Sequence, residues 1–179
     1  MKILVLTGSP HKEGTSALLA DAFIAGAREA GHEVSRFDAA FHMINPCLGC
    51  DHCMEHNGKC VYRDDMDALR RVIVDAELIA FVTPLYYFGM TAQLKRVLDR
   101  FYAFNGQLMD SPKKAVLLAT GADTDPAAFG ALVSHYAANC RYLGWEDAGQ
   151  VLALGVGVRS DIEATHFPQA ARDLGKSIK

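Results

Sequence analysis

Short unbroken runs of apolar residues alternate along the chain with longer stretches in which apolar and polar residues mix. Residues 3–6, 78–83 and 114–120 are such runs, and a glycine or proline follows each within two residues. Short apolar runs rich in β-branched residues are typical of strands buried on both faces, as in a parallel sheet. Residues 32–37, where apolar and polar positions alternate, and residues 150–158 are expected to form two further strands.

Between these runs, apolar residues recur at the spacing of one helix face. The pattern predicts helices over residues 17–24, 66–73, 94–102 and 129–143, and a final helix from Asp161 onward. Each predicted helix follows a predicted strand. Because strands and helices alternate, the pattern favours strands that run parallel and are joined by helical crossovers.

Five strands, each followed by a helix, predict an α/β fold with a five-stranded parallel sheet and helices on both faces. Residues 1–179 are expected to form this single domain, with a cysteine-rich loop inserted at about 47–60. Ligands of such sheets bind beyond the carboxyl ends of the strands. Three polar or aromatic loops, at 8–16, 84–91 and 120–126, each follow a strand and should therefore meet at one edge.

The first of these loops has the features of an anion site. The strand stops in Gly8–Pro10, and Thr15 or Ser16 is a suitable N-cap for the helix that follows. Free backbone N–H groups at a helix start attract anions, and His11 and Lys12 can add positive charge. An ordinary strand-to-helix loop with a good cap is the alternative. The loop lacks both the P-loop and the dinucleotide glycine patterns, so one phosphomonoester, as in FMN, fits better than a pyrophosphate.

Composition narrows the classes of partner. The net charge is −3 with no cluster of basic residues, which argues against nucleic acid or a membrane surface. No apolar run is long enough to span a bilayer, and no signal-peptide pattern opens the chain. We therefore expect a cytoplasmic protein with reduced thiols, whose five cysteines indicate metal, cluster or redox chemistry rather than structural disulfides.

Four of the cysteines form one compact block with the spacing Cys-x2-Cys-x2-Cys-x6-Cys: Cys47, Cys50, Cys53 and Cys60. Two x2 steps allow three thiolates to turn toward one centre, and the x6 arm brings in the fourth. Bacterial ferredoxins share the x2-x2 start, whereas zinc usually takes two separated pairs. A [4Fe–4S] cluster is favoured over vacant or oxidised thiols and over zinc. Zinc remains an alternative because His52 and His56 could serve as additional ligands. Cys140 lies on an apolar helix face and is expected to be a core residue.

Three segments carry a resemblance to a known family. Gly8-Ser9-Pro10 with Gly14-Thr15-Ser16 resembles the phosphate loop of the flavodoxin-like NAD(P)H-dependent FMN reductases. The segment from Pro84 to Arg100 is similar to that family's second flavin loop and following helix. The cysteine block resembles the iron–sulfur flavoprotein subfamily, whose members hold FMN and a [4Fe–4S] cluster. This resemblance implies a flavodoxin-like, doubly wound sheet.

The resemblance also implies a set of cofactor-binding residues. By this resemblance the phosphate is held by Ser9, His11, Gly14, Thr15 and Ser16. The ribityl chain and flavin ring are contacted by Pro84, Leu85, Tyr86, Tyr87, Phe88 and Gly89, and the far side of the ring by Thr120 and Gly121. The cluster is held by Cys47, Cys50, Cys53 and Cys60. Relatives often carry Arg where His11 stands, so this chain has less positive charge at the expected phosphate site. The resemblance further implies a homodimer or dimer of dimers, with a cluster that air can destroy.

Together these features predict a flavin-dependent oxidoreductase that couples two-electron to one-electron chemistry, with no side chain acting as a general acid. NAD(P)H or a ferredoxin-like protein would be the redox partner. A cluster-free NAD(P)H-dependent FMN or quinone reductase is the first alternative, and a non-catalytic flavodoxin-type electron carrier is the second. Residues 155–160 follow a strand but lack a third glycine, so a turn explains them better than a second nucleotide site.

Overall fold

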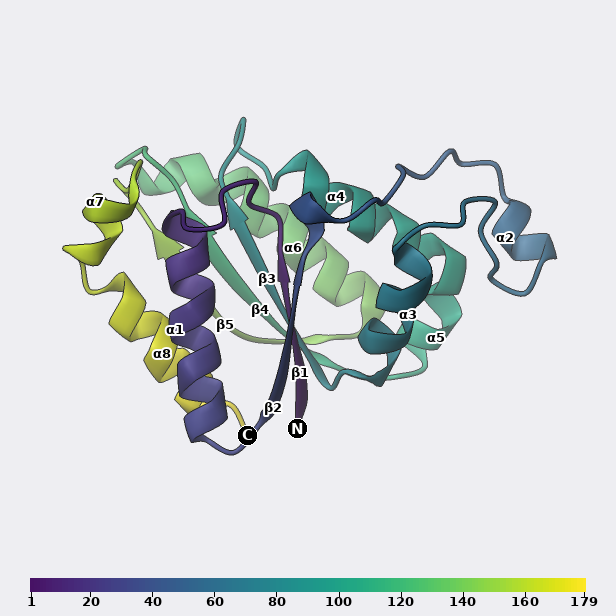
Figure 1. Ribbon diagram of the computed structural model, residues 1–179, viewed down its shortest axis with the longest axis horizontal. Helices are drawn as coiled ribbons and strands as arrows, with labels where there is room; N and C mark the ends of the chain where they lie inside the picture. The colour runs from purple at the N-terminus through teal and green to yellow at the C-terminus, as the bar shows by residue number, and fades with distance from the viewer.

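The computed structural model describes all residues from 1 to 179, and one parallel sheet lies at its centre (Figure 1). Its strand order is β2-β1-β3-β4-β5, and every neighbouring pair is parallel. This is the order of flavodoxin-like doubly wound sheets, so the predicted fold class is confirmed. The strands are β1 (Lys2–Thr7), β2 (Glu33–Asp38), β3 (Leu78–Pro84), β4 (Lys114–Thr120) and β5 (Glu146–Ala153).

Helices cover both faces of the sheet (Figure 1). None of them combines the length and the apolar composition that a bilayer crossing requires. The α-helices are α1 (Thr15–Glu29), α2 (His52–Glu55), α3 (Met66–Asp75), α4 (Ala92–Asp99), α5 (Asn105–Met109), α6 (Gly130–Leu143), α7 (Arg159–Glu163) and α8 (Phe167–Ser177), and 3-10 helices cover Ala39–Phe41, Arg100–Phe104 and Pro126–Phe129.

The unbroken apolar runs are explained by two hydrophobic clusters, one on each face of the sheet. Leu4 and Leu6 of β1 join the cluster that α3, α4 and α6 cover. Ile3 and Val5, which point the other way, join the cluster under α1 and α8. Because successive strand residues face opposite sides, both sets must be apolar. Cys140 of α6 is buried in the first of these clusters, as expected.

On the second face, α1 and α8 approach each other at two glycines. A Cβ atom built on Gly26 would lie 1.9 Å from the carbonyl oxygen of Arg172, and one built on Gly175 would lie 2.3 Å from that of Phe23. The two backbones are thus in contact where no side chain intervenes. Glu29 of α1 also pairs with Arg172 and Lys176 of α8.

The prediction for the end of the chain was wrong in position. β5 covers Glu146–Ala153 rather than residues 150–158, because an edge strand with an exposed first half has a polar sequence there and gives no apolar signal. The tail forms two helices rather than one. Pro168 stands in the first turn of α8, where its missing N–H costs no hydrogen bond.

Candidate functional site

A pocket of about 880 Å³ lies at the carboxyl edge of the sheet. The loops after β1, β3 and β4 line it, as expected from the parallel strand order, and the turn after β5 closes it. Pro84 pairs with Thr120 across β3 and β4, and Leu85 N–H donates to the Thr120 carbonyl at 2.7 Å, which sets two of these loops side by side. A volume of this order suits a cofactor-sized ligand.

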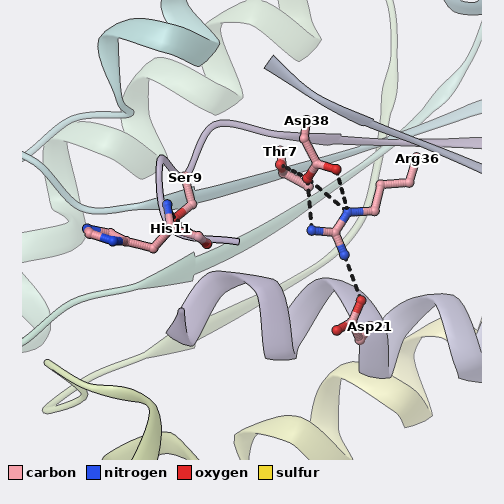
Figure 2. Close-up of polar contacts among 6 residues, drawn as sticks. All are labelled: Thr7, Ser9, His11, Asp21, Arg36 and Asp38. Atoms are coloured by element: carbon pink, nitrogen blue, oxygen red, sulfur yellow. Dashed lines mark hydrogen bonds and ion pairs between the residues drawn. The ribbon is translucent and has the colours of Figure 1, made fainter. Parts of the chain in front are cut away.

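The loop after β1 presents backbone donors to this pocket. The N–H groups of Lys12, Glu13 and Thr15 have no hydrogen-bond partner. The Ser9 hydroxyl accepts from His11 N–H at 3.2 Å and so fixes the turn (Figure 2). A Cβ on residue 14 would lie 3.0 Å from the Cβ of His11, so glycine lets the chain pass closely there. Unpaired N–H groups at the start of α1 form a cradle for an anion.

The hydroxyls of Thr15 and Ser16 do not cap α1, contrary to the sequence prediction. The N-cap is Gly14, and it makes no side-chain cap bond. Both hydroxyls instead bond to Thr120 Oγ1, at 3.0 Å from Thr15 and 2.8 Å from Ser16. Thr120 ends β4 and is buried, so these bonds join the first loop to the third. In α4, by contrast, the N-cap is a threonine, Thr91, whose hydroxyl accepts from Leu94 N–H.

A charged network braces the first loop from behind (Figure 2). Thr7 donates to Asp38 at 2.6 Å across β1 and β2. Arg36 pairs with the same carboxylate at 2.8 Å and with Asp21 of α1 at 2.6 Å. Figure 2 shows the His11 ring pointing away from this network. Arg36 is therefore committed to holding β2 against α1 and is not a free cation for the pocket.

The aromatic loop contributes only its first part to the pocket. Tyr86 and Gly89 exchange backbone hydrogen bonds of 3.0 and 3.1 Å and form a tight turn. Tyr87 and Phe88, at the tip, adopt φ of 46° and 64° in the left-handed region and are exposed. Of the sequence-assigned flavin residues, the structure brings nine together around the pocket: Ser9, His11, Gly14, Thr15, Pro84, Leu85, Tyr86, Thr120 and Gly121. Ser16, Tyr87, Phe88 and Gly89 lie outside that lining.

From sequence, the turn after β5 is interpreted as a plain turn and not as part of a binding site. Val156, Gly157, Val158 and Arg159 all line the pocket, and so does Ala122. Arg159 Nη1 donates to the carbonyl of Glu13 at 3.1 Å, which ties α7 to the first loop. Its Nε pairs with Glu163 at 2.7 Å. The turn's position after a strand is visible in the sequence, but the turn carries no motif that distinguishes a pocket-lining turn from an ordinary one.

The side chain of Lys12 takes a different course from that of Arg159. Its ammonium lies 4.9 Å from the centroid of the Phe41 ring, in a cation–π contact with the segment after β2, and Phe41 does not line the pocket. Lys12 therefore offers the pocket its backbone N–H, whereas Arg159 brings a guanidinium to the pocket wall.

The four clustered cysteines line one small recess of about 20 Å³. That volume holds about one water molecule. Cys47 and Cys50 are exposed, and burial together with the charges of the neighbouring thiols raises the pKa of Cys53. No three His, Cys, Asp or Glu side chains lie close enough to hold one metal ion as placed. Figure 1 shows α2, which carries Cys53, projecting at the opposite end of the molecule from α7.

A buried ion pair lies under the cysteine loop. Arg100 and Asp64 have side chains that are 2% and 0% exposed, and they meet at 2.9 Å. Burial works against the charge of Asp64, but hydrogen bonds from Arg100 and Asn45 outweigh it and lower the pKa of the carboxyl group. Burial likewise opposes the charge of Arg100, and Asp64 outweighs it, so the pKa of Arg100 is raised. Both groups are therefore ionised at neutral pH.

Replacing Thr120 with valine is expected to destabilise the fold by about 1–3 kcal/mol, because the Ser16 hydroxyl would be buried without a partner. The free energy of unfolding in urea measures this loss. The double variant Thr120→Val with Ser16→Ala removes both partners of the buried bond and should recover most of the loss, because the Thr15 hydroxyl that remains belongs to a half-buried residue. Equal stabilities of Thr120→Val and the parent protein would show that these hydroxyl bonds contribute nothing.

Comparison with known proteins places the chain in a family. The profile of the family NADPH-dependent FMN reductase matches residues 1–141. An iron–sulfur flavoprotein of Archaeoglobus fulgidus is 36% identical over 104 residues, which cover 58% of this chain and 47% of that protein. The chain thus spans about half the length of the iron–sulfur flavoproteins that it matches.

Two further proteins match nearly the whole chain. A putative NAD(P)H-dependent FMN-containing oxidoreductase, YwqN of Bacillus subtilis, is 27% identical and covers 87% of this chain and 86% of its own length. The crystal structure of an azoreductase from Bacillus anthracis superposes with a TM-score of 0.76 at 18% identity, covering 99% of this chain and 100% of that one. The profile match extends from β1 through most of α6 and includes the loops after β1, β3 and β4. The chain therefore belongs to the NADPH-dependent FMN reductase family.

Proposed function

We propose that the protein is a flavin-dependent oxidoreductase that binds FMN at the carboxyl edge of its sheet and takes electrons from NAD(P)H. We further propose that Cys47, Cys50, Cys53 and Cys60 hold a [4Fe–4S] cluster. The observation that carries the proposal is the single pocket formed by the strand-end loops, with unpaired N–H groups at one end. Family membership supports the flavin, and the names of the iron–sulfur relatives support the cluster.

The residues of the pocket fit a phosphorylated flavin. Lys12, Glu13 and Thr15 offer N–H groups to the phosphate, and Arg159 and His11 offer side-chain donors beside them. Leu85 and Tyr86 provide apolar lining, and Gly121 also lines the pocket. A Cβ at position 121 would lie 2.9 Å from the ring of the buried Phe129, so glycine lets this loop pack closely on the core.

The cysteine loop fits a cluster by its donor set. Four thiols line one recess, and thiolates are the ligands that iron–sulfur clusters use. The recess is small, so the exposed thiols of Cys47 and Cys50 would have to turn toward Cys53 when the site fills. When bound, FMN would exchange electrons in pairs or singly, and the cluster would carry them one at a time.

The placement of the two sites favours a dimer. They share no lining residue, and α2 of the cysteine loop projects on the opposite side of the molecule from α7, whose first residue lines the other pocket (Figure 1). Electron passage between the two cofactors would therefore use the cysteine loop of a second copy. We propose a homodimer or dimer of dimers on this ground.

The test is a visible absorption spectrum of protein purified without oxygen, with iron and FMN assayed on the same sample. The proposal expects flavin bands on a broad cluster absorption, with about four irons per chain. Flavin bands without iron, even after reconstitution with iron and sulfide, would leave a cluster-free reductase. Absence of flavin after incubation with FMN would overturn the proposal.

Replacing Cys50 and Cys53 with serine is expected to bring iron from about four per chain to near zero, while FMN binding stays unchanged. The control is Cys140→Ala, which changes a cysteine of the core and should keep both cofactors. Rapid NAD(P)H oxidation by a variant with all four loop cysteines replaced by serine would favour the cluster-free reductase. No direct NAD(P)H oxidation, with reduction of the flavin only when a ferredoxin-like donor is present, would favour an electron carrier.

A further inference from the structure

Arg100 is a buried cation that shares its recess with the four clustered cysteines. It begins the 3-10 helix after α4, and only 3% of its surface is exposed. Its side chain lines the recess of Cys47, Cys50, Cys53 and Cys60. Its guanidinium carbon lies 5.5 Å from the centre of the Tyr62 ring, which belongs to the same loop.

The guanidinium joins the two ends of the cysteine loop. Nη1 donates to Asp64 at 2.9 Å and to the carbonyl of Asn45 at 3.0 Å, and Nη2 donates to Asp64 at 3.2 Å. Asp64 in turn accepts from the backbone and side-chain nitrogens of Asn45, at 2.9 and 3.2 Å. Asn45 and Asp64 flank all four cysteines. One side chain therefore fixes where the loop leaves the domain and where it returns.

The remaining donor of Arg100 has no partner. Nε is buried and makes no hydrogen bond, which is costly for a group in this setting. The two carboxylates of the recess are already engaged, because Asp99 pairs with Lys95 and Asp51 accepts from Tyr102. The thiols of the same recess are the groups that would gain an acceptor role on becoming thiolates. The hydrogen bonds to Asn45 and Asp64 therefore account for the two terminal nitrogens of the guanidinium but not for its Nε–H.

We propose that Arg100 is a positioning residue of the cysteine site, which holds both ends of the loop and supplies positive charge and its free Nε–H to the sulfur atoms. This inference rests on the proposed cluster. Groups that hydrogen-bond to metal ligands orient them and change metal affinity, and donors to sulfur shift the cluster's reduction potential.

The experiment compares four proteins after anaerobic reconstitution with iron and sulfide: the wild type, Arg100→Lys, the double variant Arg100→Met with Asp64→Leu, and Arg96→Lys. Lysine keeps the charge but not the planar set of donors. The double variant removes both members of the buried ion pair. This destabilises a protein less than removing one member, which would leave the other charge buried without a partner. Arg96 is the matched control, since it lies on α4, also has a buried Nε without a partner and does not line the recess. Iron affinity, the midpoint potential, FMN content and the melting temperature are measured on each.

Arg100→Lys and the double variant are expected to bind iron about 10-fold more weakly, with a lower midpoint potential in any cluster that forms, while FMN content stays at the wild-type level. Arg96→Lys should match the wild type. Wild-type iron affinity and potential in both Arg100 variants would overturn the inference and leave the cluster standing. An equal loss in Arg96→Lys would overturn it as well. Failure of the wild type itself to bind iron would refute the cluster and, with it, the role of Arg100.

Discussion

Alanine at position 26 is expected to destabilise the protein by at least about 2 kcal/mol and to lower its melting temperature by several degrees. The added Cβ would lie 1.9 Å from the Arg172 carbonyl, so α1 and α8 would have to separate. Alanine favours an isolated helix by about 1 kcal/mol over glycine, and this gain only partly offsets the clash. Guanidinium unfolding followed by circular dichroism measures the change.

The matched control for this prediction is Gly130→Ala at the start of α6. A Cβ there meets no atom within 4 Å, so this variant should be as stable as the parent or more stable by up to about 1 kcal/mol. Gly175→Ala, on the other side of the contact, should behave like Gly26→Ala, since its Cβ would lie 2.3 Å from the Phe23 carbonyl. If Gly26→Ala and Gly130→Ala proved equally stable, the close approach of α1 and α8 would be refuted.

Arg159→Met is expected to weaken FMN binding by about 10- to 100-fold. Charge-assisted hydrogen bonds contribute about 1.5–3 kcal/mol, and 1.4 kcal/mol corresponds to a factor of ten. Arg159 lines the pocket and holds the Glu13 carbonyl at 3.1 Å, beside the unpaired N–H groups of the first loop. Quenching of FMN fluorescence on titration with protein lacking flavin gives the dissociation constant.

The control variants separate charge from geometry. Arg141→Met removes an exposed arginine in the last turn of α6, at the other end of the sheet, and should leave FMN affinity unchanged. Arg159→Lys keeps the charge and should retain part of the affinity. Lys12→Met should have a smaller effect than Arg159→Met, because its ammonium lies over Phe41. Unchanged affinity in Arg159→Met would remove this residue from the phosphate site.

The central strands could be predicted from sequence because both of their faces are buried. β1, β3 and β4 read as continuous apolar runs, and the alternation with helices then predicts a parallel sheet whose strand-end loops converge. The edge strand β5 is exposed at Glu146 and Asp147 and only half-buried over residues 148–150, so this part of the strand has no apolar run and carried no such signal. Hydrophobic patterning reports burial, and it fails where a strand is held mainly by backbone hydrogen bonds along one side.

The residues of the pocket were likewise predictable only where they leave a local signal in the sequence. Nine sequence-assigned residues line it because loops and glycines leave local signals, whereas Arg159 reaches it from a turn with no motif. Thr15 and Ser16 read as helix caps from local propensity, but Thr120, which lies far along the chain, takes their hydroxyls. The cysteine spacing is visible in sequence, while the link from Arg100 to Asp64 depends on tertiary packing alone.

The hydrogen bonds among Asn45, Asp64 and Arg100 close the cysteine loop at its two ends, and we expect the loop to unfold as a unit separate from the rest of the domain. Apart from the buried carboxylate of Asp64, the residues from 45 to 65 are at least partly exposed, so the loop contributes little to the global free energy of folding. Its amide protons should exchange with deuterium through local opening, while those of β1, β3 and β4 exchange only when the whole domain unfolds. Loss of the proposed cluster from the loop should therefore leave the protection of these central strands intact.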